Sequence, residues 1–338
     1  MKRLWLFGIL PFFLWAGPYS QEIIENPERP PAPNAGRIVS AQPLWNIEGT
    51  GNDYYLTNPS RIRMSQDGSI FVLDTNKILR FNREGRFMRD YKTGGAESFF
   101  ISFDLAGDRL IVFDRRERKI HQIGPEGQVE QSFAVEGFYT DFLFQADNRL
   151  FFLDQAGGAL YSLSLEGKDR RDIAKLPSNQ LSESEGPAMR VVTAAVRSVL
   201  SPDGKVWLSN QFEYLVHRLD LQKGRVDKSF RRPYKRVAAN PSAPQRFKID
   251  IAGFVRRDDC LWVITSTYDP EKGDLIDVYD FEGRYIDNFF LRFSDSNVAA
   301  SIGFAPKDIV GDEMVFVQRK GTDVAIRKCA LKPEAPAP

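Results

Sequence analysis

Six short apolar runs, each preceded by a turn sequence, set the pattern of hydrophobic and polar positions along the chain. The runs begin at residues 70, 110, 150, 206, 261 and 314, and turn pairs such as Asp67-Gly68 and Asp203-Gly204 precede them. Apolar runs of about four to eight residues bounded by Gly, Asp and Asn are typical of β-strands. The starts lie 40, 40, 56, 55 and 53 residues apart, and repeats of about 40 to 50 residues are typical of β-propeller blades.

Each of the first five repeats continues in the same order after its apolar run. In the first repeat, residues 78–81 form another apolar segment, Glu84-Gly85 marks a turn, and residues 86–91 form a further segment. Glycine supplies the positive φ that tight hairpin turns require. The pattern therefore predicts an all-β fold, a six-bladed β-propeller whose blades are four-stranded antiparallel sheets.

The sixth repeat lacks a fourth strand, because residues 326–331 run directly into a proline-rich end. A spare apolar segment, residues 37–47, lies before the first repeat. We expect this N-terminal strand to complete the last blade, which closes the ring and pairs an otherwise exposed sheet edge. The propeller is thus expected to span residues 37–331, between a proline-rich linker at 21–36 and a disordered tail at 332–338.

Residues 1–20 have the pattern of a secretory signal peptide. Lys2 and Arg3 precede an apolar stretch over residues 4–16, and small residues follow as far as Ser20. This stretch is shorter than the roughly 20 residues that span a membrane. We expect cleavage near Ser20, a periplasmic or extracellular location, and no membrane span after cleavage. An uncleaved N-terminal anchor is the alternative.

Residues 58–91 read NPSRIRMSQDGSIFVLDTNKILRFNREGRFMRDY, and the Gly-rich sequence GGAESFF follows shortly after them. This stretch resembles an NHL repeat; the second repeat matches as well, the third less closely, and the last three only in strand pattern. The resemblance implies a six-bladed propeller of TolB-like architecture over residues 37–331. It implies no single function, since such propellers include lyases, lactonases, binding modules and scaffolds.

The charge balance argues against one class of partner. The chain has 46 basic and 45 acidic residues, which gives a formal net charge of +1. Proteins that bind nucleic acid usually present a basic field. We therefore expect no nucleic-acid partner.

The apolar run of each repeat ends in a polar residue, in order Asp74, Asp114, Asp154, Asn210, Thr265 and Gln318. In a propeller these residues lie around one mouth of the central channel. The first four could bind Ca²⁺ there, since Ca²⁺ takes about six to eight oxygen ligands. A repeated Asp or Asn also stabilises turns by hydrogen bonds to nearby backbone groups, and repetition in register favours this second interpretation.

The two histidines, His121 and His217, occupy the same position in the third strand of their repeats. Two histidines in different blades do not form a metal site without further ligands. We interpret both histidines as ordinary strand residues, because other repeats place Leu79, Tyr161, Asp277 and Arg327 at this position. The sequence contains no nucleophile-elbow, zinc-protease or phosphate-loop motif.

Two insertions, residues 176–193 and 231–247, lengthen the later repeats. Both connect a fourth strand to the next first strand, so we expect them on one face of the ring, where loops on a rigid scaffold concentrate binding residues. The second insertion supplies the candidate ligand-binding residues Arg231, Arg232, Tyr234, Lys235, Arg236 and Arg246. They could bind an anionic glycan, a phosphate or an acidic partner; a solvated basic loop is the alternative.

The chain has two cysteines, Cys260 and Cys329. Their spacing matches no metal-binding motif. Cys260 begins the second strand of the fifth repeat and Cys329 lies in the third strand of the sixth, so the two fall in neighbouring blades. An exported protein could bridge them; two buried free thiols are the alternative.

These observations predict an exported, non-catalytic binding or scaffold propeller without a cofactor. Its loop-bearing face would recognise a protein, peptide or glycan, and the protein would be monomeric. The alternative is a metal-dependent hydrolase or lyase that holds calcium at the channel mouth. A third possibility is a structural part of a larger envelope complex, which would present a large exposed apolar patch.

Overall fold

The computed structural model describes residues 22–92, 98–136, 140–154, 159–175, 197–209, 213–235, 250–257, 259–293, 307–320 and 322–334. Every regular element among these residues is a β-strand. In this part of the chain, no helix has the length and apolar character needed to cross a membrane.

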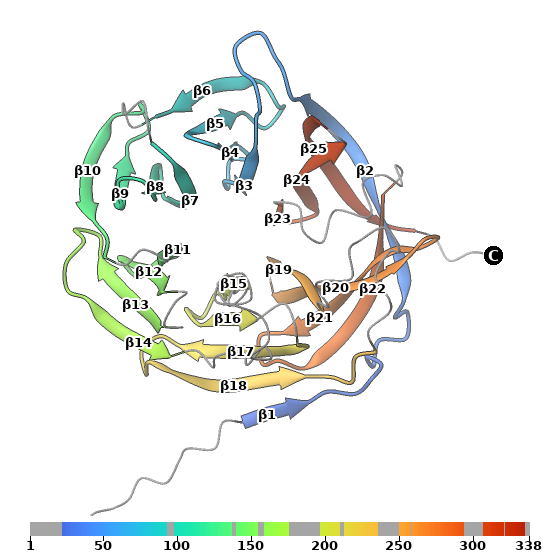
Figure 1. Cartoon of the computed structure of the whole chain (residues 1–338). Helices are drawn as coiled ribbons and strands as arrows, with labels where there is room; N and C mark the ends of the chain where they lie inside the picture. Colours follow the sequence, from blue (N-terminus) through green and yellow to red (C-terminus); the bar gives the residue numbers. More distant parts are fainter. Residues whose placement is uncertain are drawn as a thin grey trace, which may run out of the picture.

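The strands form antiparallel sheets that stand side by side around a common centre, the arrangement of a β-propeller (Figure 1). Three of these sheets, here called blades, have four strands each in sequence order. The strands of these blades are β3 (Pro59–Met64), β4 (Ile70–Asp74), β5 (Lys77–Phe81) and β6 (Phe87–Tyr91); β7 (Phe100–Ala106), β8 (Arg109–Asp114), β9 (Lys119–Ile123) and β10 (Val129–Ala134); and β11 (Thr140–Ala146), β12 (Arg149–Asp154), β13 (Ala159–Ser164) and β14 (Arg171–Lys175).

A fourth blade carries an additional strand on its outer edge. The blade consists of β15 (Arg197–Leu200), β16 (Val206–Ser209), β17 (Leu215–Asp220) and β18 (Arg225–Arg231). The short strand β1 (Glu22–Glu25) pairs in parallel with β18, from Glu22 opposite Lys228 to Glu25 opposite Arg231. Part of the segment expected to be a linker therefore lies against the ring, where it covers the edge of β18.

The remaining strands form one eight-stranded sheet with β2 (Arg37–Glu48) inside it. On one side of β2 lie β19 (Ile251–Arg257), β20 (Cys260–Asp269), β21 (Gly273–Asp280) and β22 (Tyr285–Phe293); on the other lie β23 (Lys307–Val310), β24 (Glu313–Lys320) and β25 (Asp323–Pro333). Residues 37–41 pair in parallel with β22, and residues 39–48 pair antiparallel with β25. The N-terminal strand thus joins the last strand of the chain, as the missing strand of the sixth repeat predicts.

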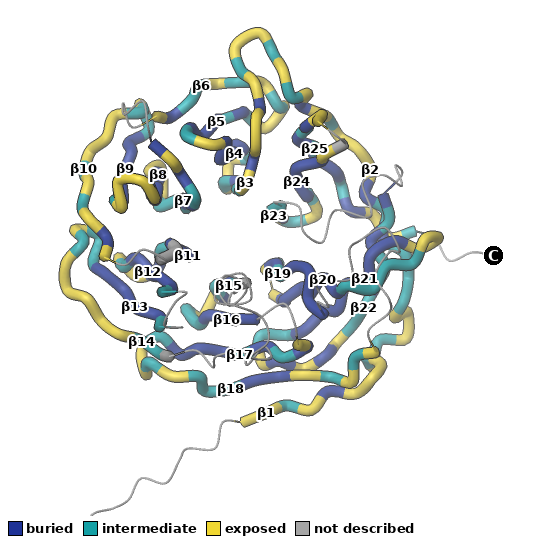
Figure 2. The backbone as a smooth tube through the Cα atoms, viewed as in Figure 1, coloured by how far each residue is buried: buried dark blue, intermediate teal, exposed yellow. Residues whose placement is uncertain are grey.

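The burial pattern explains why these segments form strands of a ring. All five residues of β4 are buried, whereas the outer strand β10 has no buried residue (Figure 2). A middle strand packs between two neighbouring sheets, so both of its faces are apolar and its sequence is an uninterrupted apolar run. Six apolar clusters fill the spaces between neighbouring strand groups, which places the core between the blades.

The glycines of the hairpin turns have the positive φ that the sequence predicts. Gly85 and Gly283, in the turns that precede β6 and β22, have φ values of 82° and 85°. At Gly283 a Cβ atom would also lie 2.9 Å from Phe230 Cδ1. A larger residue is disfavoured there by both the backbone conformation and the close contact.

Candidate functional site

The buried aspartates at the ends of the second strands hold neighbouring backbone in place. Asp74 is fully buried and accepts hydrogen bonds from the amides of Thr57 and Asn58, just before β3. Asp114, also fully buried, accepts through Oδ1 from the amides of Phe99, Arg116 and Glu117. Each side chain therefore fastens the segment that enters its blade. Asp114 also binds amides of the turn that follows it, as the turn-stabilising interpretation expects, whereas the partners of Asp74 lie before β3.

The other members of this series contribute no common site among the described residues. Thr265 Oγ1 accepts from the amide of Thr267 at 3.1 Å and donates to the carbonyl of Leu275. Gln318 Oε1 accepts from the guanidinium of Arg327. Asp154 is half-buried at the end of β12, and Asn210 lies outside the described residues.

Arg232, a candidate ligand-binding residue, forms an internal ion pair. Its Nε and Nη2 atoms donate to Asp277 Oδ2 at 2.9 and 2.6 Å, and the two side chains are 7% and 0% exposed. Tyr214 OH donates to the same carboxylate, and Tyr285 OH donates to its Oδ1 atom at 2.7 Å. Burial raises the pKa of the Asp277 carboxyl, an effect that Arg232 and the two tyrosines oppose. Tyr214 lies just before β17, Arg232 just after β18, Asp277 in β21 and Tyr285 in β22. Arg232 therefore connects neighbouring strand groups of the ring.

Of the other candidate ligand-binding residues in the second insertion, two contact the ring, one is exposed and two lie outside the described residues. Tyr234 OH lies 3.0 Å from Ser266 Oγ and 2.9 Å from Thr267 Oγ1. Arg231 pairs with Glu25 of β1 at 2.6 Å. Lys235 is exposed, whereas Arg236 and Arg246 lie outside the described residues, as does all of the first insertion at 176–193.

The cysteine bridge that the sequence allows is absent from the structure. Cys260 and Cys329 are both free and buried, at 8% and 3% exposure. They belong to the apolar cluster around the eight-stranded sheet. Burial raises the pKa of each thiol to about 11, so both remain protonated at neutral pH and pack as small apolar side chains.

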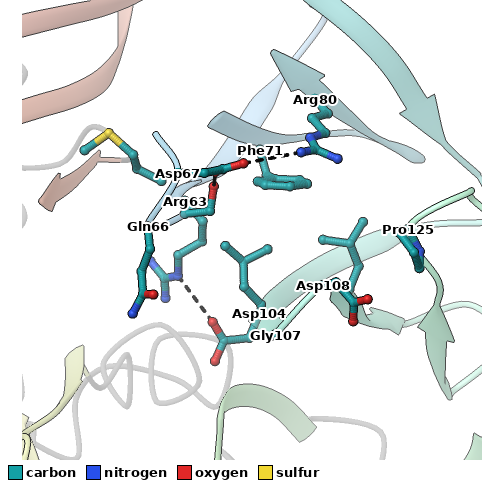
Figure 3. Close-up of a pocket in the computed structure, with 13 residues that line it drawn as sticks. Arg63, Gln66, Asp67, Phe71, Arg80, Asp104, Gly107, Asp108 and Pro125 are labelled. Carbon is teal, nitrogen blue, oxygen red and sulfur yellow. Dashed lines mark hydrogen bonds and ion pairs between the residues drawn. The ribbon is translucent and has the colours of Figure 1, made fainter. Parts of the chain in front are cut away.

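A cleft of about 640 Å³ opens between the β3–β6 and β7–β10 blades (Figure 3). It is lined by the β3–β4 turn at 65–67, the β7–β8 turn at 107–108 and Pro125 in the turn after β9. Adjacent strands are antiparallel, so these turns lie at the opposite end of the strands from the strand ends that the insertions connect. The cleft therefore lies on the face of the ring opposite to the one predicted for binding.

The cleft combines paired charges with an apolar wall. Arg63 Nε lies 3.5 Å from Asp104 Oδ1, and Arg80 Nη2 lies 3.6 Å from Asp67 Oδ2 (Figure 3). The Arg80 guanidinium also stands over the ring of Phe71, 5.3 Å from its centroid. The site thus offers both signs of charge and an aromatic side chain within one recess, and its volume is in the range of about 300–1,000 Å³ that is typical of ligand pockets.

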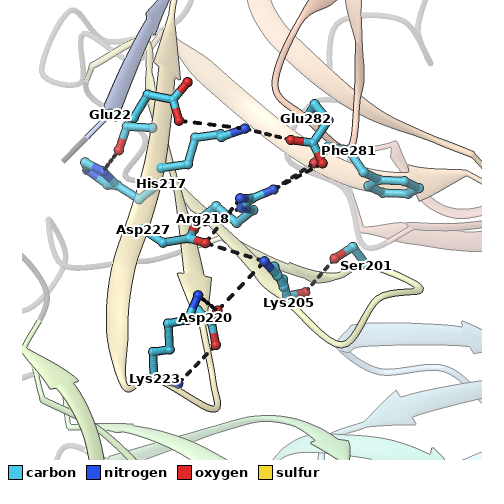
Figure 4. A network of polar contacts seen from close by, with 12 residues as sticks. Glu22, Ser201, Lys205, His217, Arg218, Asp220, Lys223, Asp227, Phe281 and Glu282 are labelled. Carbon is cyan, nitrogen blue, oxygen red and sulfur yellow. Dashed lines mark hydrogen bonds and ion pairs between the residues drawn. The ribbon is translucent and has the colours of Figure 1, made fainter.

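A second polar cluster connects the β15–β18 blade to its neighbours (Figure 4). Arg218, whose side chain is 8% exposed, donates to both carboxylate oxygens of Asp227 and lies 3.5 Å from Glu282 of the β21–β22 turn. Lys228 lies 2.6 Å from Glu282 and 3.9 Å from Glu22 of β1. These charges pair with one another across strand groups, which indicates a role in holding the ring together.

The two histidines, which share a position in the repeat, have the same local arrangement. His121 Nδ1 lies 2.8 Å from Ser132 Oγ, and His217 Nδ1 lies 2.7 Å from Ser229 Oγ, each on the next strand of its blade. Burial lowers the pKa of both imidazoles. Burial thus favours the neutral form of both rings at neutral pH.

No known family profile and no curated protein matches the chain. Solved structures do match: a protein from Bacteroides fragilis considered to be exported is 12% identical, with a TM-score of 0.58 over 93% of this chain and 100% of that one. A DUF4221 member from Bacteroides vulgatus is 9% identical, with a TM-score of 0.56 over 88% and 99%. An inactive variant of virginiamycin B lyase from Staphylococcus aureus is 14% identical, with a TM-score of 0.52 over 86% and 99%. At these identities the likeness shows the propeller fold alone.

The sequence pattern did not predict the cleft. Asp67 and Asp108 were visible as turn residues of the repeat, but the cleft brings together turns of two blades that are about forty residues apart. A signal was present in the side chains that follow these turns, because Phe71 and Arg80 place an aromatic and a charged group on one blade face. Their convergence with Asp104 depends on how the blades pack.

Proposed function

We propose that this chain is an exported, non-catalytic binding propeller with six blades, and that the cleft in Figure 3 is its binding surface. The blade number follows if the eight-stranded sheet is counted as two blades, β19–β22 and β23–β25 with β2 as the outer strand of the second. Repeats at six positions in the sequence support this count.

The proposed location outside the cytoplasm rests on two observations. Residues 1–20 have the charge and apolar pattern of a signal peptide. A protein of similar fold from Bacteroides fragilis is considered to be exported. We therefore propose a periplasmic or extracellular location.

The residues that line the cleft support the proposed binding function. Its charged residues are both acidic and basic, and they lie beside an apolar wall formed by Phe71, Leu105 and Leu110. An extended polar ligand such as a peptide segment or a glycan chain offers matching hydrogen-bond donors and acceptors together with apolar surface. A rigid ring keeps these groups in place, which reduces the ordering cost of binding.

We do not propose a calcium-dependent hydrolase or lyase, because the two fully buried second-strand aspartates use their oxygens on backbone amides. Asp74 accepts through both carboxylate oxygens from amides at its blade entrance. Asp114 accepts through Oδ1 from one amide at its blade entrance and from two in the β8–β9 turn. A calcium site at the channel mouth would need about six oxygens directed to one point.

Arrays of peptides and glycans test the proposed function. The exposed residue Asp108 at the cleft rim would be changed to Arg, which introduces the opposite charge and a larger side chain. Asp312→Arg is the matched control, because Gly311-Asp312 occupies the same turn position in another part of the ring. We expect wild type and Asp312→Arg to bind the same ligands and Asp108→Arg to lose at least about tenfold in affinity, or about 1.4 kcal/mol. Equal binding by all three proteins would contradict the proposed surface.

A further inference from the structure

Three potential metal ligands gather around the turn between β8 and β9, outside the cleft. Asp114 ends β8, Glu117 lies in the turn, and His121 lies in β9. Each offers one ligand atom within 4.8 Å of the other two. The pairing of Val112 with His121 places Asp114 and His121 on the same face of the two strands, two positions apart.

Two of these side chains have a buried ligand atom without a partner. Asp114 Oδ2 and His121 Nε2 form no hydrogen bond, although the two residues are 0% and 4% exposed. Buried polar atoms are normally paired, so an unpaired one requires an explanation such as a bound ion. Here two such atoms occur within one cluster of potential ligands.

The other polar atoms of the same two side chains are fixed. Asp114 Oδ1 accepts from the amides of Phe99, Arg116 and Glu117 at 3.3, 2.9 and 3.1 Å. His121 Nδ1 contacts Ser132 Oγ at 2.8 Å. A metal-binding imidazole typically uses its second nitrogen in a hydrogen bond of this kind, which fixes the tautomer and the ring orientation. These contacts leave Oδ2 and Nε2 as the atoms available to an ion.

Glu117 supplies the third ligand, and the second carboxylate, from the surface. Its side chain is 35% exposed and lies 2.9 Å from Lys119 Nζ. An exposed ion pair of this kind contributes little and is readily exchanged. The neighbouring turn residues Arg115, Arg116 and Arg118 are also exposed, so their charges are screened by solvent.

We propose that Asp114, Glu117 and His121 bind one divalent first-row transition-metal ion through Asp114 Oδ2, His121 Nε2 and a carboxylate oxygen of Glu117. Imidazole with carboxylate is a ligand set that suits Zn²⁺ and related ions, whereas Ca²⁺ and Mg²⁺ prefer oxygen alone. Three protein ligands leave a coordination position for water or a ligand. This site differs from a calcium site at the channel mouth, because its ligands come from one turn of one blade.

The histidine content of the chain allows a direct test. The full chain, purified with a tag that is removed and leaves no added histidine, would be labelled with ¹⁵N at its two histidines and titrated with Zn²⁺. Each imidazole gives its own nitrogen signals, and His217 serves as an internal control because it has the same serine contact. We expect saturation at one Zn²⁺ per chain, a shift of the His121 Nε2 signal, unchanged His217 signals, and no His121 shift with Ca²⁺.

Variants separate this site from general binding of metal to the surface. Glu117→Gln and His121→Gln should each weaken Zn²⁺ affinity, measured by calorimetry, by at least about tenfold. The control Glu126→Gln changes an exposed glutamate in the next turn of the same blade and should leave the affinity unchanged. Because Glu117 is exposed, its replacement is compatible with folding and keeps the test informative if His121→Gln is unstable. Unchanged affinity in Glu117→Gln, or equal shifts of both imidazoles, would overturn the proposal.

Discussion

Arg231 and Arg232 are adjacent in the sequence but lie in different environments. Arg231 pairs with Glu25 at the surface, whereas Arg232 pairs with the fully buried Asp277 and stands over the rings of Tyr214 and Tyr285. Removal of a side chain that neutralises a buried charge leaves that charge unpaired, which strongly destabilises the folded protein. The environment of each arginine, and not its charge alone, determines its role.

We predict that Arg232→Ala lowers the free energy of unfolding by about 3–5 kcal/mol, because the Asp277 carboxylate loses its cation inside the protein. Arg231→Ala should change it little, since the pair with Glu25 is exposed to solvent. Urea unfolding of the two variants and the wild type measures both values. Similar losses in the two variants would contradict the assigned role of Arg232.

The buried carboxyl of Asp274 makes the stability of the folded protein depend on pH. Burial raises the pKa of this carboxyl from 3.8 to about 8, while Lys307 opposes the shift. An acid whose pKa is higher in the folded state favours folding at low pH and loses that advantage as pH rises between the two pKa values. We therefore expect Asp274 to contribute a loss of stability as pH rises from about 4 to 8.

Asp274→Asn isolates this effect, because the amide resembles the protonated acid in shape and stays neutral. Its stability relative to the wild type should rise by up to about 4 kcal/mol between pH 5 and pH 8, at about 1.4 kcal/mol per pH unit. Urea unfolding at the two pH values gives the difference. A constant difference would show that Asp274 is ionised in the folded protein across this range.

At the scale of elements, β2 and β1 make unequal contributions to the ring. β2 pairs with both β22 and β25 and buries Val39, Ala41 and Ile47. β1 pairs only with β18, and Asn26 after it is held by hydrogen bonds to Arg231 and Gly283. Loss of β2 would expose two sheet edges and apolar side chains, whereas loss of β1 exposes one edge.

We predict that deletion of residues 22–33 leaves a folded protein with a slightly lower melting temperature, since β2 and its contacts remain. Deletion of residues 22–48 should prevent cooperative folding or cause aggregation, because the edges of β22 and β25 lose their partner. Circular dichroism melts and size-exclusion chromatography distinguish these outcomes. A cooperative melt of the longer deletion would show that β2 is dispensable for ring closure.

The strands could be predicted from the sequence more fully than the cleft and the buried charged clusters. The apolar runs and turn pairs locate the second strands at Ile70, Leu110 and Leu150, because a strand buried on both faces leaves a local signal. The missing strand at the end of the chain predicts the partner of β25. The parallel pairing of β1 with β18 could not be predicted, since four residues with charged ends carry no periodic signal.

The buried ion pair and the cleft could not be predicted from the sequence, because they depend on contacts between residues that are far apart along the chain. Arg232 and Asp277 are 45 positions apart in the sequence, so the basic segment that carries Arg232 gave no sign that this side chain is internal. The cleft arises from turns of two blades, and its paired charges become neighbours only after the blades pack. The cluster of Asp114, Glu117 and His121 is local in sequence, but the unpaired atoms within it become visible only in the structure.

At the scale of the whole molecule, the described strands form a ring that presents its turns at the surface. Apolar clusters connect each strand group to the next, and the polar cluster of Figure 4 adds charged contacts between the β15–β18 blade, β1 and the β21–β22 turn. Such a scaffold keeps surface groups in place without large rearrangement on binding. We propose that this rigid ring binds an extended ligand in the cleft.

Hydrogen exchange with and without a ligand selected from the arrays locates the binding surface at the level of single turns. We expect the ligand to slow amide exchange in the β3–β4 turn at residues 65–68 and in the β7–β8 turn at residues 107–109, and the Asp108→Arg variant to abolish this change. Exchange elsewhere in the ring should remain the same. Protection confined to the opposite face, at the β8–β9 turn or residues 232–235, would contradict this proposal.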